Sequence, residues 1–522
     1  MDRLEALIRA MSDPRIYPHK PDSVQIVQTH ISVVFVAGKL VYKVKKPLNL
    51  GFLDFTTLDK RRFFCEQEVR LNSRFSEGIY LGVVGIYEDR SGLNLAGEGE
   101  EIEAAVLMTH IPEDRIMVSM LKKDLVTPDM LDRLADRIAY FHSHAESGPH
   151  ISGFGSTEVI YQNLKENFDQ VSPFVGRTIG EDTYAQTSRL AFDFFDGHKE
   201  LFLQRMRNGF IRDCHGDLHL DHVVMLDGIM LYDCIEFNDR FRYGDTAADL
   251  GFLLMDLDFQ GYPAFADHLS KRYAQSSGDE DILKLLGFYK SYRAFVRGKV
   301  LGFELDEPEI SQTDWEAAIR TAGDYFRLSL SYLKPPPPPA LIIMCGLMAT
   351  GKSFMAAKLG KRLGIEPVRS DLVRKDIHGV ERFKHRLDMY GGGIYTANAT
   401  ELTYGALLDE ARQALTRGRS VILDASFISY EHRKRARELA HEAKARFRVI
   451  ECSAPEKIIR KRLEDRLSEQ REPSDARWEI FHAQQAAFEP IRPDEGRDHR
   501  LWESTSDLDT FLVSVVRELI SS

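Results

Sequence analysis

The chain has 522 residues, a length that suits about three to four domains of ordinary size. Hydrophobic residues make up 43% and charged residues 29%, which is enough apolar material for several cores without disulfide bonds. With 69 basic and 80 acidic side chains the net charge is −11. This balance disfavours a protein whose whole surface coats nucleic acid or an anionic membrane, but it leaves room for a local basic patch.

The five cysteines are scattered and form no CxxC pair, so neither a zinc site nor a disulfide framework is indicated. The N-terminus lacks the apolar core of a signal peptide, and no apolar run approaches the roughly 18 residues of a membrane-spanning helix. We therefore expect a cytoplasmic enzyme with no membrane partner. The sequence does not indicate an oligomeric state.

The first part of the chain predicts two lobes. Strand patterns at 31–36 and 40–44 flank a turn, helical spacing follows at 58–75, and another strand pattern covers 104–108. From residue 130 to about 207 the apolar residues recur at three- and four-residue steps, which indicates helices. We expect one domain over residues 1–330, with a β-rich lobe at 24–110 and an α-rich lobe at 111–330.

Five consecutive prolines, Pro335 to Pro339, mark the clearest boundary. Such a run adopts polyproline II and acts as a short, stiff spacer, so we expect a linker over 331–339. A proline-rich ligand for another protein is the weaker interpretation, because the run lies tightly between two structured segments. The apolar run 340–345 follows at once and predicts a buried parallel strand that begins a second domain, 340–522.

A dense polar segment lies in the first domain. His215, Asp217, His219 and His222 fall within eight residues, and Asp233 follows sixteen residues after Asp217. Two carboxylates at strand or loop edges suit a phosphotransferase that uses Mg²⁺ and ATP, since one accepts the proton of a substrate hydroxyl and the other binds the metal. Zinc is the alternative for the histidines, but their spacing fits no standard site.

This pattern resembles the aminoglycoside-phosphotransferase and choline-kinase family, which has a protein-kinase-like fold, over roughly residues 24–330. The resemblance implies that Asp217 is the catalytic base and Asp233 a Mg²⁺ ligand, with Glu236 a candidate second ligand. It also implies that Lys43 holds the α- and β-phosphates and that Glu68 pairs with this lysine. Lys45 and Glu66 are close rivals for the last two roles, and the segment 104–110 would lie beside adenine.

Two features depart from the family. The family has an asparagine metal ligand five residues after the catalytic aspartate, where this chain has His222. Imidazole is a poor partner for the hard Mg²⁺ ion, so Asp221 or a water takes over this role or the site is weakened. In addition, no glycine-rich phosphate-covering loop precedes Lys43; residues 28–32 occupy that place.

The second domain opens with a segment that matches the pattern GxxxxGK[ST] at every defined position. Such a loop points its backbone N–H groups at phosphate oxygens, and the lysine reaches the β- and γ-phosphates while the serine binds Mg²⁺. An apolar strand before the loop and a helical pattern after it supply the expected context. The predicted nucleotide-binding residues are Gly346, Leu347, Met348, Ala349, Thr350, Gly351, Lys352 and Ser353.

Further polar residues follow the predicted strands of this domain. Asp424 ends the strand 420–424 and can hold Mg²⁺, the alternative being a surface aspartate. Asp371 follows the apolar residues 365–368, so it can face the ligand crevice and take a proton, and Arg374 lies one helical turn on and can clamp an anionic substrate. The alternative for this pair is a helix N-cap beside a solvated arginine.

Arg462 and Arg466 share a helix face and can stabilise a transferring phosphate, although an ordinary salt-bridged helix fits equally well. Basic residues also gather between 433 and 448, where they either hold a polyanion or form a solvated helix face. Residues 340–522 resemble the P-loop kinases of the polynucleotide-kinase and gluconate-kinase type. That resemblance implies Asp371 as general base, Arg374 as substrate contact, and a lid that runs from Arg462 and Arg466 to 474–476.

The whole chain resembles bacterial fusions of an aminoglycoside-phosphotransferase-like domain with a P-loop ATP-binding domain. The expected fold is an α+β bilobal kinase-like domain followed by an α/β P-loop domain with a parallel sheet. The expected function is transfer of the γ-phosphate of ATP, with Mg²⁺, to a hydroxyl of a small molecule or a nucleic-acid end. An ATP-switched binding protein with a degenerate N-terminal kinase domain is the alternative, and the sequence does not identify the acceptor.

Overall fold

The computed structural model describes residues 3–90, 92–305, 311–381, 396–468 and 478–521. The chain divides into two compact units, of which the first comprises Met1–Leu257 and Phe265–Lys334 and the second comprises Asp258–Ala264 and Pro335–Ser522. The short segment Asp258–Ala264 thus belongs with the second unit, a grouping that no sequence pattern indicates.

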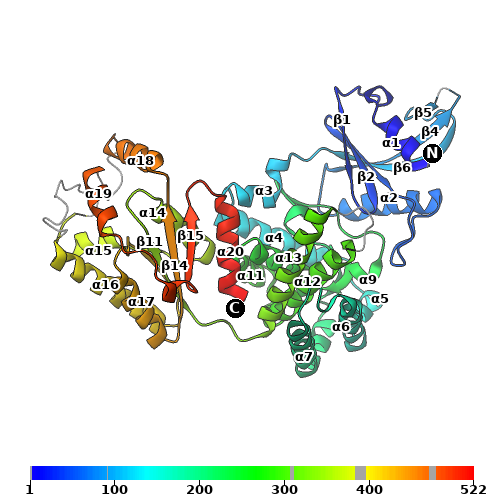
Figure 1. Ribbon diagram of the computed structural model, residues 1–522. Helices are drawn as coiled ribbons and strands as arrows, with labels where there is room; N and C mark the ends of the chain where they lie inside the picture. Colours follow the sequence, from blue (N-terminus) through cyan, green and yellow to red (C-terminus); the bar gives the residue numbers. More distant parts are fainter. Residues whose placement is uncertain (1–2, 91, 306–310, 382–395, 469–477, 522) are drawn as a thin grey trace. The chain divides into compact units, whose positions relative to one another are not determined.

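A six-stranded antiparallel sheet forms the first lobe, in the order β1-β2-β3-β6-β4-β5 (Figure 1). Gly38, with φ +66°, makes the tight turn between β2 and β3 that the sequence predicts. Helix α2 places Cys65 against Ala104 and Val106 of the sheet. The elements of this lobe are α1 (Arg3–Met11), β1 (Val24–Gln28), β2 (Ser32–Ala37), β3 (Leu40–Lys45), α2 (Leu58–Asn72), β4 (Tyr80–Asp89), β5 (Gly92–Asn94) and β6 (Glu100–Thr109).

Helices dominate the second lobe of this unit. In α4, Leu131, Leu134 and Ile138 are buried at three- and four-residue steps, and the Thr127 hydroxyl caps the helix by accepting from the Met130 N–H. The longer helices are α4 (Pro128–His144), α6 (Thr157–Val171), α7 (Glu181–Gly197), α8 (Lys199–Arg207), α10 (Thr246–Phe259), α11 (Pro263–Ser277), α12 (Ile282–Glu304) and α13 (Gln312–Leu333). The short elements are α3 (Met117–Lys122), α5 (Pro149–Ser152), β7 (Ile211–Asp213), β8 (Val223–Met225), β9 (Ile229–Leu231), α9 (Asp239–Arg242) and β10 (Tyr243–Asp245).

The second unit contains a five-stranded parallel sheet in the order β12-β13-β11-β14-β15. Its strands are β11 (Ala340–Cys345), β12 (Val368–Arg369), β13 (Val421–Asp424), β14 (Arg446–Ser453) and β15 (His499–Glu503). Its helices are α14 (Lys352–Leu363), α15 (Ser370–Ile377), α16 (Ala397–Thr416), α17 (Tyr430–Glu442), α18 (Glu456–Ser468), α19 (Trp478–Ala487) and α20 (Leu508–Ser521).

Every residue of β11 is buried because helices cover both faces of the sheet. Leu341 and Ile343 pack with α16 and α17, whereas Ile342 and Met344 pack with α14 and α20 (Figure 1). Strands β12 and β13 lie on one side of β11, and β14 and β15 lie on the other, so the crevice at the carboxyl end of β11 is a topological switch point. The loop that follows β11 is therefore placed where open α/β sheets bind ligands.

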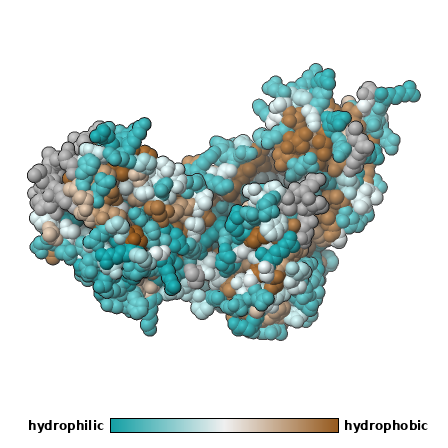
Figure 2. Space-filling view, viewed as in Figure 1, coloured by the Kyte–Doolittle hydropathy of each residue, from teal (hydrophilic) through white to brown (hydrophobic). Residues whose placement is uncertain are grey.

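The fold class is the one predicted from the sequence: a bilobal α+β domain followed by an α/β domain with a parallel sheet. Among the described residues no helix combines the length and apolarity needed to cross a membrane. Hydrophilic residues cover much of the face of each unit that is seen in Figure 2.

Candidate active sites

Two lysines on β3 point to the same side of the sheet because they are two residues apart. The Lys43 ammonium donates to Glu68 Oε1 at 2.9 Å and to Asp233 Oδ1 at 2.5 Å. The Lys45 ammonium donates to Glu68 Oε2 at 2.6 Å and also to Glu236. Glu68 therefore pairs with both lysines, and the two ion pairs link the sheet to the loop after β9.

The two lysines differ in how deeply they and their acidic partners are buried. Lys45 is 1% exposed and lies between two buried carboxylates, whereas Lys43 faces Asp233, whose side chain is 37% exposed. The rival Glu66 is 54% exposed and lies 3.4 Å from Arg62. Glu236, expected as a second metal ligand, is held by Lys45 instead.

Asp249 orients the loop that carries Asp217. Its two carboxylate oxygens accept the backbone N–H groups of His215 and Gly216, at 2.9 and 2.8 Å. Gly216 has φ +82°, and a Cβ there would lie 2.8 Å from the carbonyl oxygen of Phe241. The loop is thus fixed by its backbone, and local spacing does not signal the role of Asp249, which lies 34 residues after His215.

The two ring nitrogens of His215 are engaged inside the protein. Nε2 donates to the Tyr232 carbonyl at 2.9 Å and Nδ1 accepts the Asp217 N–H at 3.3 Å. Burial lowers the pKa of His215 to about 4, so the ring stays neutral. Because both ring nitrogens are engaged in this way, a zinc site among the histidines would lack His215 as a ligand.

His219 lies between two carboxylates. Its Nε2 is 3.6 Å from Asp217 Oδ2 and its Nδ1 is 3.4 Å from Asp221 Oδ2. Burial disfavours the imidazolium, but the two carboxylates prevail and raise the pKa of His219 to about 10. Desolvation alone would raise the pKa of Asp217, but the interaction with His219 outweighs it and holds the pKa of this carboxyl well below its usual range.

Asp233 and His222 face each other across 3.7 Å, measured from Oδ2 to Nε2. Asp233 has φ +60°, a strained conformation for a non-glycine residue, and its N–H donates to the Tyr80 hydroxyl at 3.1 Å. Desolvation favours the neutral acid, but Lys43 lowers the pKa of Asp233. A site of one carboxylate and one imidazole does not fit Mg²⁺, which prefers oxygen ligands.

The phosphate-binding loop of the second unit depends on unusual backbone angles. Gly346 and Gly351 have φ of +125° and +108°, and Ala349 has φ +59°. A Cβ at Gly346 would overlap the carbonyl oxygen of Cys452, and one at Gly351 would lie 3.1 Å from Trp502. Gly346 is therefore required by the close approach of the Cys452 backbone, and Gly351 by its positive φ beside the Trp502 ring.

Side chains from three elements meet this loop. The Lys352 ammonium donates to the Leu347 carbonyl at 2.6 Å, and burial lowers the pKa of this lysine. Arg462 of α18 donates to the Ala349 carbonyl at 3.0 Å, which brings this predicted lid residue to the loop. Gln484 of α19 accepts the Met348 N–H at 2.6 Å, a contact that sequence spacing does not signal.

Asp424 ends β13, next to the P-loop strand, and its carboxylate lies 3.8 Å from Arg369. Asp371 occupies the first turn of α15, and burial, together with the charge of Asp424, raises the pKa of Asp371. Arg374 is buried and donates to the Thr400 hydroxyl at 3.4 Å. Ser353 and Asp424 are oxygen donors of the kind that Mg²⁺ takes.

Part of the predicted lid cannot be compared. Residues 474–476 lie outside the described residues, and the side chain of Arg466 does as well, although its backbone belongs to α18. The described part of the lid is anchored by Ile459 and Leu463, which pack with Ala349 and Phe481.

The basic stretch between 433 and 448 is largely paired within the unit. Arg433 is fully buried and bonded to Glu495, Arg437 lies 2.8 Å from Asp494, and Arg435 binds Glu401. These three arginines are therefore paired with acidic residues that lie far away in the sequence.

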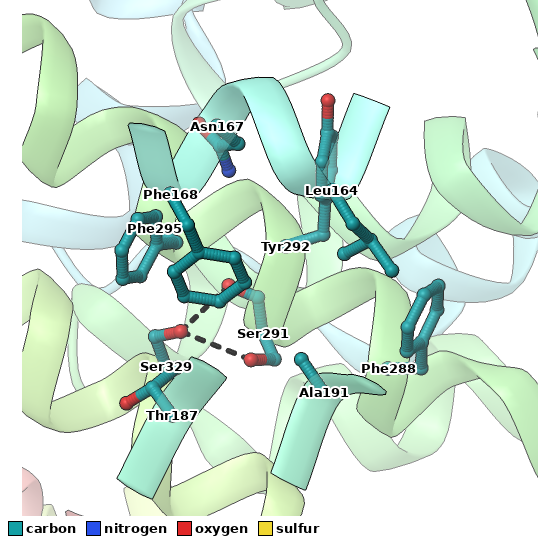
Figure 3. A pocket seen from close by; sticks show the side chains of 10 residues that line it. All are labelled: Leu164, Asn167, Phe168, Thr187, Ala191, Phe288, Ser291, Tyr292, Phe295 and Ser329. Atoms are coloured by element: carbon teal, nitrogen blue, oxygen red, sulfur yellow. Dashed lines mark hydrogen bonds between the residues drawn. The ribbon is translucent and has the colours of Figure 1, made fainter. Parts of the chain in front are cut away.

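A small cavity of about 10 Å³ lies among α6, α7, α12 and α13, and none of the candidate site residues lines it (Figure 3). Apolar rings such as Phe168 and Phe295 line most of it, and Ser291 and Ser329 bond to each other beside it. Its volume suits a single water molecule, so it is a packing defect rather than a substrate site.

Two family models match parts of this chain. Residues 89–286 match the model of the phosphotransferase enzyme family, and residues 341–491 match the model of an AAA domain. The first match contains Asp217, His222 and Asp233, whereas Lys43 and Glu68 lie before it. The second contains the complete phosphate-binding loop.

Similar proteins cover either most of the chain or a smaller part of it. Uncharacterized protein Rv2004c of Mycobacterium tuberculosis (strain ATCC 25618 / H37Rv) is 29% identical over 443 residues, 84% of this chain and 86% of the relative. A choline/ethanolamine kinase family protein from Mesorhizobium loti is 12% identical, with 63% of this chain and 99% of that one covered and a TM-score of 0.39. A gluconokinase from Sinorhizobium meliloti 1021 is 15% identical, with 35% and 93% covered and a TM-score of 0.25.

Proposed function

We propose that this chain, in which a domain of the phosphotransferase enzyme family precedes a P-loop kinase-type domain, is a kinase with two ATP sites. Each site would transfer the γ-phosphate to a hydroxyl group of a separate acceptor. The observation that carries the proposal is the arrangement at the carboxyl end of the parallel sheet. There the loop before Lys352, the oxygen ligands Ser353 and Asp424, and the half-buried acid Asp371 belong to adjacent elements.

In the P-loop site, Ser353 and Asp424 would hold Mg²⁺, which would neutralise charge on the β- and γ-phosphates. Lys352 would bind the same phosphates. Asp371 would accept the proton of the acceptor hydroxyl while the acceptor oxygen bonds to the γ-phosphorus and the bond to the β-phosphate oxygen breaks, so that ADP leaves. Its raised pKa makes it a stronger base than an ordinary aspartate.

Two arginines would complete this site. Arg374, held by Thr400 of α16, would bind an anionic group of the acceptor. Arg462, which reaches the loop at Ala349, would offset the charge of the transferring phosphate. An acceptor with a carboxylate or phosphate group beside its hydroxyl fits this pair best.

In the first unit, Lys43 would bind the α- and β-phosphates and Asp217 would orient the acceptor hydroxyl. The lowered pKa of Asp217 makes it a weak base, which suits phosphoryl transfer because the proton leaves late in a loose transition state. No step is assigned to Mg²⁺ here, because His222 and Asp233 do not fit that ion.

Asp371→Asn in the full chain tests the proposal. It should abolish phosphate transfer by the P-loop site while a fluorescent ATP analogue still binds, since the loop is untouched. Asp376→Asn, an exposed change on the same helix, is the matched control and should transfer normally. Full transfer by Asp371→Asn would remove the catalytic assignment and would favour the ATP-switched binding protein.

One observation favours that alternative for the first unit alone. His222 replaces an oxygen ligand beside Asp233, so the unit would bind nucleotide without transferring phosphate if the metal were lost. Asp217→Asn discriminates the two functions: a kinase loses phosphate transfer, whereas a nucleotide sensor keeps its affinity for nucleotide.

A further inference from the structure

His222 is held in one orientation by a backbone bond. Its Nδ1 lies 2.8 Å from the carbonyl oxygen of Asp217. A carbonyl oxygen only accepts, so Nδ1 must carry the hydrogen, and in the neutral ring the lone pair is on Nε2. That nitrogen is the one that faces Asp233.

The two carboxylate oxygens of Asp233 face different residues. Its Oδ1 accepts from Lys43, and its Oδ2 lies 3.7 Å from His222 Nε2. In the neutral ring the two lone pairs face each other, and a cation between the two atoms would bind both of them. Two ligand bonds of about 2.1 Å that span this distance meet at roughly 120°, an angle that a coordinated metal ion accepts.

The neighbouring histidine does not compete for this role. Both ring nitrogens of His219 face carboxylates, one on Asp217 and one on Asp221. This arrangement suits two N–H donors and leaves no lone pair for a metal. Asp217, His219 and His222 lie close enough together to hold a metal ion. Of the two rings, His222 is thus the one that can offer a nitrogen lone pair to a cation.

Ligand type then decides which ion fits. Mg²⁺ takes oxygen ligands and loses water reluctantly, whereas divalent first-row transition metals accept imidazole nitrogen, Mn²⁺ with the lowest affinity of the series. We propose that His222 and Asp233 hold a divalent transition-metal ion, with Mn²⁺ as the ion to test, in place of Mg²⁺. The inference rests on the proposed nucleotide-binding function of the first unit.

The second unit provides a contrast within the same chain. Its predicted ligands, Ser353 and Asp424, are both oxygen donors, so that site keeps the Mg²⁺ preference. The chain would therefore use different metals for its two sites, and metal choice would set which of them is active.

Pulsed electron paramagnetic resonance of bound Mn²⁺ tests the proposal. The sample is the full chain carrying Lys352→Ala and Asp424→Asn, which silence the second site, together with Mn²⁺ and a non-hydrolysable ATP analogue. A directly bound imidazole nitrogen should modulate the echo, and labelling with ¹⁵N-histidine should change this modulation without any further substitution. Mn²⁺ that binds without nitrogen coupling would overturn the proposal.

Two variants identify the histidine that supplies the bound nitrogen. His222→Asn should lose the coupling but still bind Mn²⁺, and Mg²⁺ should displace Mn²⁺ from it at a concentration lower by about tenfold or more than from the parent chain. His219→Asn should keep the coupling. Loss of coupling in His219→Asn alone, or equal displacement by Mg²⁺ from the His222→Asn variant and its parent, would refute the assignment.

The outcome is separate from that of the proposed function. Nitrogen-coupled Mn²⁺ in a chain that transfers phosphate to no acceptor would support this metal site and refute the kinase. Phosphate transfer by the first unit with Mg²⁺, without nitrogen coupling to Mn²⁺, would do the reverse.

Discussion

Replacing Lys45 by methionine should destabilise the first unit by about 3 kcal/mol or more at pH 7. The change leaves Glu236 in a buried position without the cation that neutralises it, although Glu68 still has Lys43. Glu236 then has to take up a proton, which at pH 7 costs about 3.4 kcal/mol for a carboxyl group whose ordinary pKa is 4.5.

The same reasoning sets the pH dependence. Once Lys45 is absent, the folded-state pKa of Glu236 lies further above its unfolded value, so the neutral acid is tolerated at low pH and the penalty grows as pH rises. The destabilisation should therefore shrink by roughly 2.7 kcal/mol between pH 7 and pH 5. Urea unfolding of the full chain at both pH values measures this difference.

Lys43→Met is the matched control. Glu68 keeps Lys45, and Asp233 is 37% exposed, so water can solvate its charge. We expect a loss of about 1 kcal/mol, together with loss of nucleotide binding by the first unit. The reasoning would be refuted if Lys45→Met unfolded at the same urea concentration as the unchanged chain at pH 7, or if Lys43→Met were the more damaging change.

Three further outcomes concern the second unit. Arg433→Met should lower the free energy of unfolding, measured in urea, by about 3–5 kcal/mol, because it leaves the buried Glu495 without a cation. A loss below about 1 kcal/mol would contradict the buried ion pair. Gly351→Ala should lose ATP binding, measured by calorimetry, because φ +108° is unfavourable for alanine; retained affinity would argue against the strained loop. If Asp371 is the base, its raised pKa places the acid limb of kcat/KM above the ordinary value of 3.8, and a pH profile with no limb above that value would exclude this role.

Local patterns in the sequence predicted much of the fold because the relevant forces act over short distances along the chain. The buried run 340–345 followed by Gly346 and Lys352 indicates a strand, loop and helix without knowledge of anything distant. The periodic apolar residues of α4 likewise indicate a helix and its buried face.

Pairings between distant segments could not be predicted in this way. The sequence left Lys43 and Lys45 as rivals, and the two lysines differ in their partners Asp233 and Glu236, which lie about 190 residues further along. The buried Arg433 looks like part of a basic surface until Glu495, 62 residues later, is placed beside it. Charge patterns read along the chain cannot show which charges neutralise one another.

Transfer of labelled γ-phosphate from ATP to a panel of metabolites and oligonucleotides tests the central claim most directly. The chain should lose one set of products in Asp217→Asn, a different set in Lys352→Ala, and all products in the double variant. Exposed Lys361→Met on α14 is the control for the second change and should leave both sets intact. A double variant that still transfers phosphate like the unchanged chain would contradict the claim that these two sites carry the activity.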